Sequence, residues 1–441
     1  MSVTLVRGLN WLGDAVMSLP ALSAIHKAAP LDDLVVLSGP ATQAIYALAA
    51  GVKKVLVDQK GWRSRLKLLK TLKSLAPQKT ILLQNAFGAA ALAFLARLPE
   101  RQGYARDARS FLLSRAIPIA PQSRLGHEVF YYLDLLKALG YEASYSTPRL
   151  AISDPKTPQP WPPGFRVAIA PGAAYGEAKR YPAQDFARVA QLLHKELPLS
   201  IVILGGTGEM AAAEEVAKRL EPDLKALNLA GRTSMSEALA VLNSCQLLIA
   251  NDSGLAHVAG ALGRPVVVLF GPTNPLATGP LAKKKLVLLD PADCAPCKNR
   301  VCPKKERICF LGLKPALVAE KILAFLKPKN QDGSPTLFWP IDQADWAEPN
   351  LSLPNLNIVK LPLASPEELR RIINQYKVDF NSAFWLSSRL DFLAFGQKLG
   401  GQTIMVVDPK NPQPFSQAYR LNPDLAAPDL SRGLEWIASQ I

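Results

Sequence analysis

The sequence predicts an α/β protein with two Rossmann-like halves, because short apolar strands alternate with helical segments in two separate series. A proline-rich stretch at 148–163 divides the two series, since closely spaced prolines suit neither a helix nor a central strand. Glycine, acidic and hydroxyl residues follow several strands, which is where open α/β sheets bind ligands. We therefore expect two domains with a cleft between them, at 1–150 and 164–327, and an appended small α/β unit at 336–441.

The expected elements follow the hydrophobic pattern in order. In the first half, strands are expected at 3–7, 34–37, 54–57 and 80–83. In the second half, they are expected at 166–170, 200–204, 225–229, 247–250, 266–270 and 286–289. Helices are expected at 15–27 and 255–262, and the appended unit shows a helix at 365–376 and a strand at 403–407. This alternation predicts parallel sheets with helices on both faces.

Composition and charge limit the classes of function. The 441 residues are enough for two full domains and a small third one. No apolar run approaches the ~20 residues of a membrane span, and the N-terminus lacks a secretory signal pattern, so we expect a cytoplasmic protein. The net charge of +15 is distributed as +10 over 1–150, +8 over 151–330 and −3 over 331–441. A basic chain attracts an anionic membrane face or a phosphorylated glycolipid, whereas nucleic acid is not expected because no nucleic-acid-binding motif is present.

The segment from Asn251 to His257 is the strongest functional signal. It joins an apolar strand to a helix of small residues, so Asp252, Ser253 and Gly254 lie where the helix begins. Unpaired backbone N–H groups and the positive end of the helix dipole favour a phosphate there. His257 has no second histidine and no acid in a metal-binding spacing, so a metal site is excluded at this position, and a helix histidine more commonly packs against a core.

Two further loops follow the first strand of each half. The loop from Gly8 to Asp14 places a carboxylate near a helix start, where it either faces a ligand in the expected cleft or is only a partner of the helix dipole. The loop from Ala170 to Pro182 contains small residues that let the backbone approach a ligand, followed by Lys179 and Arg180. A cation there neutralises a diphosphate, unless the pair is simply solvated.

A glycine-rich loop follows the second strand of the second half. Gly206-x-Gly208-x-x-Ala211 fits the dinucleotide-binding fingerprint in its alanine-ending form. The next strand does not end in the acid that this fingerprint requires for a ribose. Glu209 either binds ribose hydroxyls or caps the helix, and a nicotinamide dinucleotide dehydrogenase stays open as a competing class.

A cluster of four cysteines carries an open alternative. The cluster consists of Cys294, Cys297, Cys302 and Cys309. Its spacing allows a thiolate-bound structural zinc or a reduced surface loop. Disulfides are not expected without a secretion signal.

A second open alternative concerns the segment 60–73. It puts Trp62, Leu66 and Leu69 at helical spacing among six basic residues. It is either a face for an anionic membrane or an ordinary amphipathic helix whose leucines face the core.

Four motifs together resemble glycosyltransferase family 9, the lipopolysaccharide heptosyltransferases, and within it most closely the heptosyltransferase II branch. The motifs are Asn10–Leu22, Pro171–Pro182, Asn251–Ala259 and Arg264–Pro275. They occur in the order typical of the family, and the resemblance covers about residues 1–327. The four-cysteine loop is also similar to that of the heptosyltransferase II branch. The appended residues 331–441 extend beyond the usual family length.

The resemblance implies a GT-B fold and an inverting, metal-independent transfer of heptose from ADP-L-glycero-D-manno-heptose to the inner core of lipopolysaccharide, in core biosynthesis. It also implies a peripheral position at the cytoplasmic face of the inner membrane. By the matching motifs, Asp14 is expected to be the catalytic base and Lys179 the diphosphate-binding cation. The acceptor side is expected to include Asn10, Trp11 and Gly13. The donor side is expected to comprise Gly172, Ala173, Ala174, Tyr175, Lys179, Arg180, Gly206, Glu209, Thr233, Ser234, Met235, Asp252, Ser253, Gly254 and His257.

The physical chemistry of inverting transfer agrees with these roles. One carboxylate must take the proton of the acceptor hydroxyl. The leaving ADP gains negative charge, which a helix N-terminus and a lysine can stabilise in place of a metal. No Asp-x-Asp pair occurs in the chain, which argues against a transferase that holds its diphosphate through a bridging metal. A related GT-B transferase for another nucleotide sugar or acceptor stays open. The role of residues 331–441 is also open, and a non-catalytic interaction module is one alternative.

Overall fold

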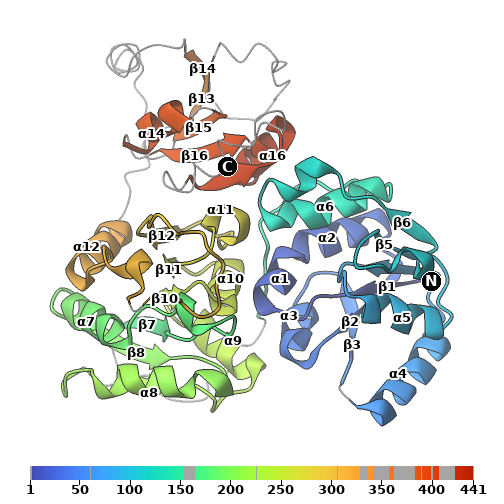
Figure 1. Ribbon diagram of the computed structural model, residues 1–441, viewed down its shortest axis with the longest axis horizontal. Coiled ribbons are helices and arrows are strands. Elements are labelled where there is room, and N and C mark those ends of the chain that lie inside the picture. Colours follow the sequence, from blue (N-terminus) through green and yellow to red (C-terminus); the bar gives the residue numbers. More distant parts are fainter. Residues whose placement is uncertain are drawn as a thin grey trace. The chain divides into compact units, whose positions relative to one another are not determined.

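The computed structural model describes residues 2–59, 61–152, 164–224, 226–304, 306–327, 336–340, 357–361, 383–388, 390–398, 401–406 and 423–440. The chain forms two compact units (Figure 1). The first unit contains residues 1–119, 132–273 and 279–325, and the second contains 120–131, 274–278 and 326–441.

The first unit contains two parallel six-stranded sheets. The sheet of the first lobe has the order β3-β2-β1-β4-β5-β6, which is the order of a dinucleotide-binding fold. Its strands are β1 (Val3–Arg7), β2 (Asp33–Ser38), β3 (Val52–Val57), β4 (Lys79–Leu82), β5 (Arg101–Tyr104) and β6 (Arg115–Ile117). The first four match the expected strands to within two residues. The pattern missed β5 and β6, because they are short strands near the edge of the sheet that carry polar and charged residues.

The sheet of the second lobe repeats this order, read as β9-β8-β7-β10-β11-β12. Its strands are β7 (Phe165–Ala170), β8 (Leu199–Ile203), β9 (Ala226–Asn228), β10 (Leu247–Asn251), β11 (Val266–Phe270) and β12 (Lys285–Leu289). All six correspond to expected strands. The central strands β10 and β11 are buried throughout, as the continuous apolar runs of a parallel sheet predict.

Helices cover both sheets. In the first lobe these are α1 (Leu12–Met17), α2 (Leu19–Ala28), α3 (Gln43–Ala47), α4 (Trp62–Leu75), α5 (Phe87–Leu95) and most of α6 (Glu128–Ala138), with 3-10 turns η1 (Pro40–Thr42) and η2 (Ser110–Leu112). The 3-10 turn η3 (Pro121–Arg124) and the first residues of α6 belong to the second unit. Later in the chain the helices are α7 (Ala183–His194), α8 (Met210–Lys218), α9 (Met235–Asn243), α10 (Gly254–Ala261), α11 (Pro275–Thr278) and α12 (Pro315–Leu326), with η4 (Glu177–Lys179), η5 (Thr207–Glu209) and η6 (Ile308–Phe310).

The first expected helix is interrupted. The sequence predicts one helix over 15–27, whereas α1 ends at Met17 and α2 begins at Leu19. Pro20 has no N–H and therefore fits the first turn of α2 better than the interior of a longer helix. The Ser18 hydroxyl donates to the carbonyl of Ala15 at the junction. Among the described residues, no helix is both long and apolar enough to cross a bilayer.

The second unit has a parallel five-stranded sheet in the order β14-β13-β15-β16-β17. Its elements are β13 (Thr336–Pro340), β14 (Asn357–Leu361), β15 (Ala383–Ser387), α14 (Leu390–Lys398), β16 (Gln402–Val406), β17 (Leu425–Ala427) and α16 (Leu430–Gln440). The strand expected at 403–407 is β16, and the helix expected at 365–376 lies outside the described residues. Within this unit the N–H of His127 donates to the carbonyl of Ala426 at 3.0 Å. The buried guanidinium of Arg432 stands 5.6 Å from the ring centre of Phe130.

Candidate active site

The candidate site lies where the strand order of both sheets in the first unit reverses. The reversal occurs between β1 and β4 in the first sheet and between β7 and β10 in the second. Crevices at the carboxyl ends of such strands are the usual ligand sites of open α/β sheets. The chain leaves β1 toward Asp14, leaves β7 toward Lys179, and leaves β10 at Asp252. Topology thus brings the three best sequence candidates to carboxyl ends of central strands.

Helices α1 and α10 connect the two lobes, and they lie side by side in Figure 1. A Cβ atom added at Gly254 would clash with the Cβ of Leu12. A Cβ at Gly13 would stand 3.0 Å from Cδ2 of His257. Both glycines therefore permit close approach of the lobes, and they bring His257 next to the turn of helix that carries Asp14.

Asp14 has the properties of a general base. It lies in the first turn of α1 and is half-buried. Burial raises the pKa of its carboxyl to about 6, and the positive charge of Lys179 opposes that rise. A carboxylate whose pKa is close to neutral is more basic than an exposed one and is still ionised at pH 7. The interaction with Lys179 also indicates that the two predicted catalytic groups face one common space.

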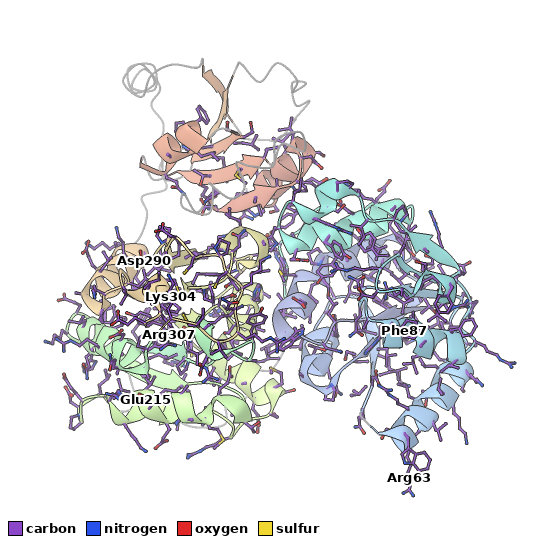
Figure 2. The ribbon with its side chains drawn as sticks, in the orientation of Figure 1. Arg63, Phe87, Glu215, Asp290, Lys304 and Arg307 are labelled. Atoms are coloured by element: carbon purple, nitrogen blue, oxygen red, sulfur yellow. The ribbon has the colours of Figure 1, made fainter. Side chains whose placement is uncertain are left out.

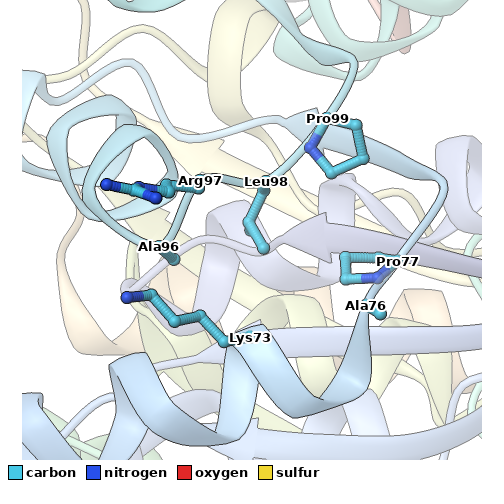
Figure 3. Close-up of a pocket in the computed structure, with 7 residues that line it drawn as sticks. All are labelled: Lys73, Ala76, Pro77, Ala96, Arg97, Leu98 and Pro99. Atoms are coloured by element: carbon cyan, nitrogen blue, oxygen red, sulfur yellow. The ribbon is translucent and has the colours of Figure 1, made fainter.

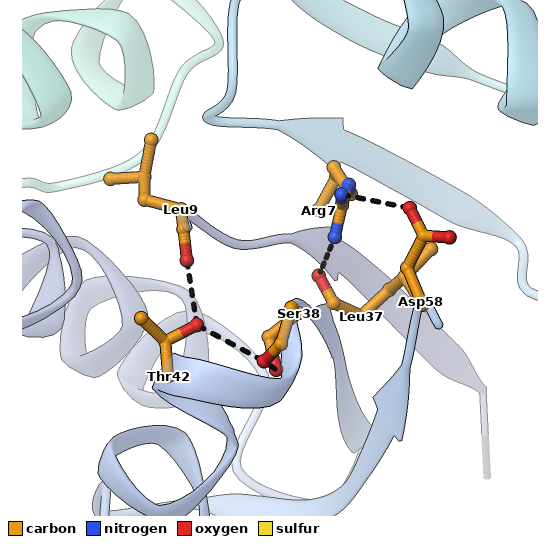
Figure 4. A network of polar contacts seen from close by, with 7 residues as sticks. Arg7, Leu9, Leu37, Ser38, Thr42 and Asp58 are labelled. Atoms are coloured by element: carbon orange, nitrogen blue, oxygen red, sulfur yellow. Dashed lines mark hydrogen bonds and ion pairs between the residues drawn. The ribbon is translucent and has the colours of Figure 1, made fainter. Parts of the chain in front are cut away.

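A set of buried hydroxyls holds the loop before Asp14. Tyr46 accepts the backbone N–H of Leu9 at 2.8 Å and lies 3.2 Å from the hydroxyl of Ser18, so it contacts both ends of this segment. Thr42 donates to the carbonyl of Leu9 at 2.8 Å, as Figure 4 shows. Burial raises the pKa of Tyr46 to about 12, so its hydroxyl stays protonated. Two side chains distant in sequence, Tyr46 and Thr42, thus fix the loop that leads to Asp14.

Lys179 is held by a buried acid in the second lobe. Its Nζ lies 2.5 Å from Oδ2 of Asp252, and both side chains are largely buried. The hydroxyl of Thr273, which follows β11, donates to the same oxygen at 2.6 Å. An ammonium has three donors, so Lys179 can bind Asp252 and an anionic ligand together.

The loop that carries Lys179 rests on a second loop, residues 290–313, which contains the four cysteines. The Lys179 ammonium lies 4.8 Å from the ring centre of Tyr175, and the guanidinium of Arg300 lies 5.1 Å from the same ring. The hydroxyl of Tyr175 donates to the carbonyl of Lys298, and Arg307 donates to the carbonyl of Arg180. Figure 2 labels Arg307 and Asp290 in this region. The Lys179 loop is therefore braced from outside its own strand and helix.

Asn251 links the two ligand loops of the second lobe. Its Oδ1 accepts the N–H of Tyr181 at 2.9 Å, and its Nδ2 donates to the carbonyl of Pro171 at 2.6 Å. The side chain is fully buried at the end of β10. A single amide therefore fixes both ends of the loop that holds Lys179, which explains its place directly before Asp252.

The start of α10 presents two buried polar atoms without partners. Among the described residues, neither Oγ of Ser253, at the N-cap position, nor Nδ1 of His257 has a hydrogen-bond partner. Burial lowers the pKa of His257 to about 4, so the imidazole is neutral at pH 7. Unsatisfied buried polar groups at a helix N-terminus indicate a ligand that supplies the missing partners. His257 is therefore packed in a core, as is common for a histidine in a helix. It also lies next to Gly13, in the turn that carries Asp14.

In the glycine-rich loop, Glu209 caps a helix, which is one of the two roles expected for it. Oε2 of Glu209 accepts the N–H of Gly206 at 2.8 Å and so caps η5. A Cβ added at Gly172 would clash with the Glu209 carboxyl group, which places Glu209 against the Lys179 loop. The other carboxyl oxygen of Glu209 is the one that faces Gly172. This loop therefore reaches the Lys179 loop through an acid that also caps a helix.

The turn before α9 is likewise capped. Ser234 forms a capping box with Glu237 rather than standing free. Thr233 and Met235 flank it, and both are half-exposed. The three residues expected on the donor side therefore form an ordered turn that is open to solvent.

The acceptor-side residues open onto solvent. Asn10 is exposed and Trp11 is 53% exposed, so Trp11 is not a packed loop aromatic. A cavity of about 310 Å³ adjoins Asn10. Its lining includes Arg7 and Arg65, and Arg7 is anchored to Asp58 at 3.1 Å and to the carbonyl of Leu37 (Figure 4). This side of the site is therefore both hollow and basic.

The cysteine loop leaves the metal alternative open. Within the part of the chain that the structure describes, no group of three or more His, Cys, Asp or Glu side chains is placed to hold a metal ion. All four cysteines are free thiols: Cys294 and Cys297 are exposed, Cys302 is half-buried, and Cys309 is buried beside Gly271. Burial raises the pKa of Cys309 to about 11, and the other three cysteines add to that rise, so the four thiols lie near one another. The structural zinc expected at Cys294, Cys297, Cys302 and Cys309 therefore stays a prediction, beside the alternative of a reduced surface loop.

Sequence reasoning missed three residues of this site: Tyr46, Asn251 and Thr273. Asn251 and Thr273 each lie at or just after the end of a central strand, so the position rule that selected Asp252 could have found them. Tyr46 lies in α3, 37 residues from the backbone N–H that it holds, and no local pattern announces such a contact. The structure also places Arg180 here, with a buried Nε that lacks a partner among the described residues.

Comparison with known proteins shows which family this chain resembles. The family model for glycosyltransferase family 9 (heptosyltransferase) matches residues 65–308. Lipooligosaccharide heptosyltransferase 2 of Haemophilus influenzae is 27% identical over 311 residues, which are 64% of this chain and 87% of that protein. Lipopolysaccharide heptosyltransferase 2 of Escherichia coli K12 is 27% identical over 312 residues, with the same coverage.

Solved structures show the same fold. The E. coli ADP-heptose LPS heptosyltransferase II superposes with a TM-score of 0.62 at 24% identity, covering 74% of this chain and 98% of that one. The E. coli heptosyltransferase WaaC with ADP gives a TM-score of 0.60 at 21% identity, covering 74% and 100%. The first unit therefore has the two-domain GT-B fold, as predicted, with a further small sheet toward the C-terminus.

Proposed function

The chain belongs to glycosyltransferase family 9, and on this basis we propose that it transfers heptose from ADP-L-glycero-D-manno-heptose to the inner core of lipopolysaccharide. The observation that carries the proposal is that Asp14, a carboxyl with a raised pKa, lies where the charge of the buried Lys179 acts on it, while the neighbouring Gly13 approaches His257 of the other lobe. Heptosyltransferase relatives at 27% identity support the choice of sugar and acceptor.

The reaction follows from the charges. The Asp14 carboxylate accepts the proton of the acceptor hydroxyl while that oxygen forms a bond to the anomeric carbon. The bond from this carbon to the diphosphate breaks on the opposite face, so the configuration inverts. The departing ADP receives the electron pair of that bond and with it additional negative charge. Asp14 is left protonated, and its raised pKa favours that outcome at neutral pH.

The second lobe supplies stabilisation of the leaving group. We assign the diphosphate to Lys179, the N-terminus of α10 and the unpartnered Oγ of Ser253. The neutral His257 offers a ring nitrogen without adding a charge. These groups together can replace a bridging metal, so we propose that transfer needs none. Gly172, Glu209 and the turn before α9 are proposed to hold the nucleoside.

The acceptor approaches the first lobe. We assign part of its anionic glycan to the cavity of about 310 Å³ beside Asn10, because Arg7 and Arg65 line that cavity. Trp11 is exposed beside the same loop and can stack on a sugar ring. Since the acceptor is anchored in a bilayer, we propose that the protein works peripherally at the cytoplasmic face of the inner membrane.

A transfer assay tests this function. Purified protein is incubated with ADP-heptose and an inner-core acceptor lacking its heptose, and the product is identified by mass spectrometry. A mass gain of one heptose is expected, with ADP released in equal amount. Calorimetric titration with ADP, UDP and NAD is the companion test, and we expect binding of ADP only. Preferential binding of UDP would favour another donor, and binding of NAD would favour the dehydrogenase class.

A further inference from the structure

One stretch of the first lobe contains no acidic residue. Between Asp58 and Glu100 there are eight lysines and arginines and no aspartate or glutamate. This stretch contains α4 and α5, which lie side by side over a common core that includes Leu68 and Ala90. The two helices thus form a surface of one charge sign, which we call the α4–α5 surface. It comprises the exposed side chains of α4 and α5 together with Phe111 of η2.

The same surface exposes large apolar side chains. Trp62 and Leu66 of α4 are 68% and 51% exposed, and Leu95 of α5 is 62% exposed. Phe111 is 73% exposed. Leu68 and Leu72 are the side chains of α4 that are buried in the core. Trp62 and Leu66 are therefore not needed for packing. The helix is therefore apolar on two sides, and only one of them faces the core.

The exposed aromatic rings are combined with cations. The Arg63 guanidinium lies 5.1 Å from the Trp62 ring centre, and Figure 2 shows Arg63 projecting from the outer end of α4. The Arg101 guanidinium lies 5.3 Å from the ring centre of Phe94. Aromatic rings flanked by basic groups are typical of surfaces that sit at the boundary between lipid headgroups and acyl chains.

A shallow hollow adds a place for an anionic headgroup. It has a volume of about 320 Å³ between the ends of α4 and α5, and Lys73 and Arg97 lie at its edge (Figure 3). Its floor is apolar, with Pro77, Leu98 and Pro99. Two cations over an apolar floor match a phosphate attached to a hydrocarbon, whereas a free polyanion gains nothing from the floor.

We propose that the α4–α5 surface binds the face of an anionic lipid bilayer. The inference rests on the proposed function in one respect, that the acceptor is lipid-linked. The cavity beside Asn10 is lined by Arg65 and Leu69 of α4 and by Leu92 and Leu95 of α5, so it lies beside the same surface. An acceptor can then stay anchored in the bilayer while its glycan enters the cavity that adjoins the loop before Asp14.

Vesicle binding tests the proposal with the full chain. Co-sedimentation is measured with vesicles of phosphatidylcholine alone and of phosphatidylcholine with phosphatidylglycerol, at low and high salt. We expect binding to the anionic vesicles only, weakened at high salt but not abolished, because apolar insertion is not screened. Binding that vanishes entirely with salt, together with equal binding to single-stranded DNA, would instead indicate a site for soluble polyanions and overturn the proposal.

Matched variants locate the surface. Lys67→Gln with Lys70→Gln is expected to weaken binding about 20-fold or more, at roughly fivefold per lysine. Trp62→Ser with Leu66→Ser is expected to weaken it about tenfold or more. The controls are Lys218→Gln with Arg219→Gln at the C-terminal end of α8, and Leu31→Ser, a still more exposed leucine outside this surface. Equal losses in variants and controls would contradict the assignment.

Two activity measurements distinguish failure of the docking surface from failure of the proposed transfer function. Turnover is measured with a water-soluble, delipidated acceptor and with the lipid-linked acceptor in vesicles. The surface variants are expected to keep wild-type turnover on the soluble acceptor and to lose it on the vesicles. If wild-type protein transfers heptose to the soluble acceptor but does not bind vesicles, the docking surface is wrong and the proposed function stands. If it binds vesicles but transfers nothing, the function is wrong and the surface stands.

Discussion

The two lobes of the first unit have the same strand order and opposite chemistry. In both, the chain leaves the first strand at the point where the sheet order reverses. In the first lobe this loop leads to a carboxylate, Asp14, held by hydroxyls of Tyr46 and Thr42. In the second lobe it leads to an ammonium, Lys179, already paired with Asp252. One topology therefore presents a carboxylate in one lobe and an ammonium in the other, and the loop residues decide which.

The first test of this division is Asp14→Asn. Turnover is expected to fall ~10²–10⁴-fold, because general-base catalysis is lost, while ADP affinity stays within about threefold. Single-turnover kinetics and calorimetry measure the two quantities. Near-normal turnover would remove Asp14 from its role.

The same variant has a stability signature. Because burial raises the pKa of Asp14, its charged form costs stability fully above about pH 6 and not at all below about pH 4. The variant is therefore expected to have a higher Tm than wild type at pH 7.5 and an equal one at pH 4. Equal Tm values at both pH values would mean that the carboxyl is not desolvated.

The converse test is Lys179→Met. ADP affinity is expected to fall about 10- to 100-fold, as for loss of a charge-assisted contact. The variant also leaves Asp252 as a buried, unpaired carboxylate, so it is expected to be less stable. Lys179→Met with Asp252→Asn separates the effects, since it should recover stability without recovering ADP binding. Lys195→Met, at an exposed position, is the control. Unchanged ADP affinity in Lys179→Met would place the diphosphate elsewhere.

Proton uptake on ADP binding tests whether Lys179 and Asp14 interact electrostatically across the two lobes. Lys179 lowers the pKa of Asp14, so a diphosphate that neutralises Lys179 should raise it. Binding of ADP near pH 6 is then expected to take up a fraction of a proton. Titration calorimetry in two buffers of different ionisation enthalpy measures that number. The difference between wild type and Asp14→Asn isolates the carboxyl from titration of the nucleotide's phosphate, and a zero difference would mean that the two groups act independently.

A smaller effect is expected from Tyr46→Phe. The ring stays, but the backbone N–H of Leu9 loses its partner, at a cost of about 1 kcal/mol. We expect a roughly three- to tenfold fall in turnover through a looser Asp14, with ADP affinity unchanged. Tyr141→Phe, in another part of the same lobe, is the control. A parallel loss of ADP affinity would show that Tyr46 supports the whole fold rather than the position of the base.

The smallest effect concerns backbone conformation, in which the lobes also differ. Of the six described non-glycine residues with positive φ, five lie in the first lobe, and Lys298 is the sixth. Ala76 ends α4 at φ +45°, where glycine is the preferred residue. Ala76→Gly is expected to raise the free energy of unfolding by about 0.5–1 kcal/mol, whereas Ala217→Gly inside α8 should lower it by a similar amount. Urea denaturation measures both.

Sequence patterns were most informative where they depend on residues close together in the chain. Apolar runs predicted the central strands of both lobes, and the rule that ligands collect at strand ends selected Asp14, Lys179 and Asp252. The sequence carried no signal for distant partners, such as Tyr46, whose hydroxyl accepts the N–H of Leu9 from 37 residues away. It also left local alternatives undecided. Glu209 could bind a ribose or cap a helix, and only its contact with the N–H of Gly206 shows the cap.

Two further cases show the same limit. Trp62 and Leu66 could not be separated from Leu69 by spacing, since exposure depends on how α4 rests on the sheet. The cysteine spacing allows a bound metal or a reduced loop, and the folded loop buries Cys309, half-buries Cys302 and exposes the other two thiols, so the choice stays a prediction. Spacing along the chain limits which side chains can meet, and the packing of the loop decides which of them do.

The tight contact between Gly254 and Leu12 has a practical consequence for inhibition. The two backbones meet so closely that one added methyl group has no room at position 254. A small apolar compound that wedges between α1 and α10 would therefore prop the lobes apart. The proposed base and the proposed nucleotide site would both stay intact but would lie farther apart. High cellular concentrations of nucleotide would therefore not displace the compound.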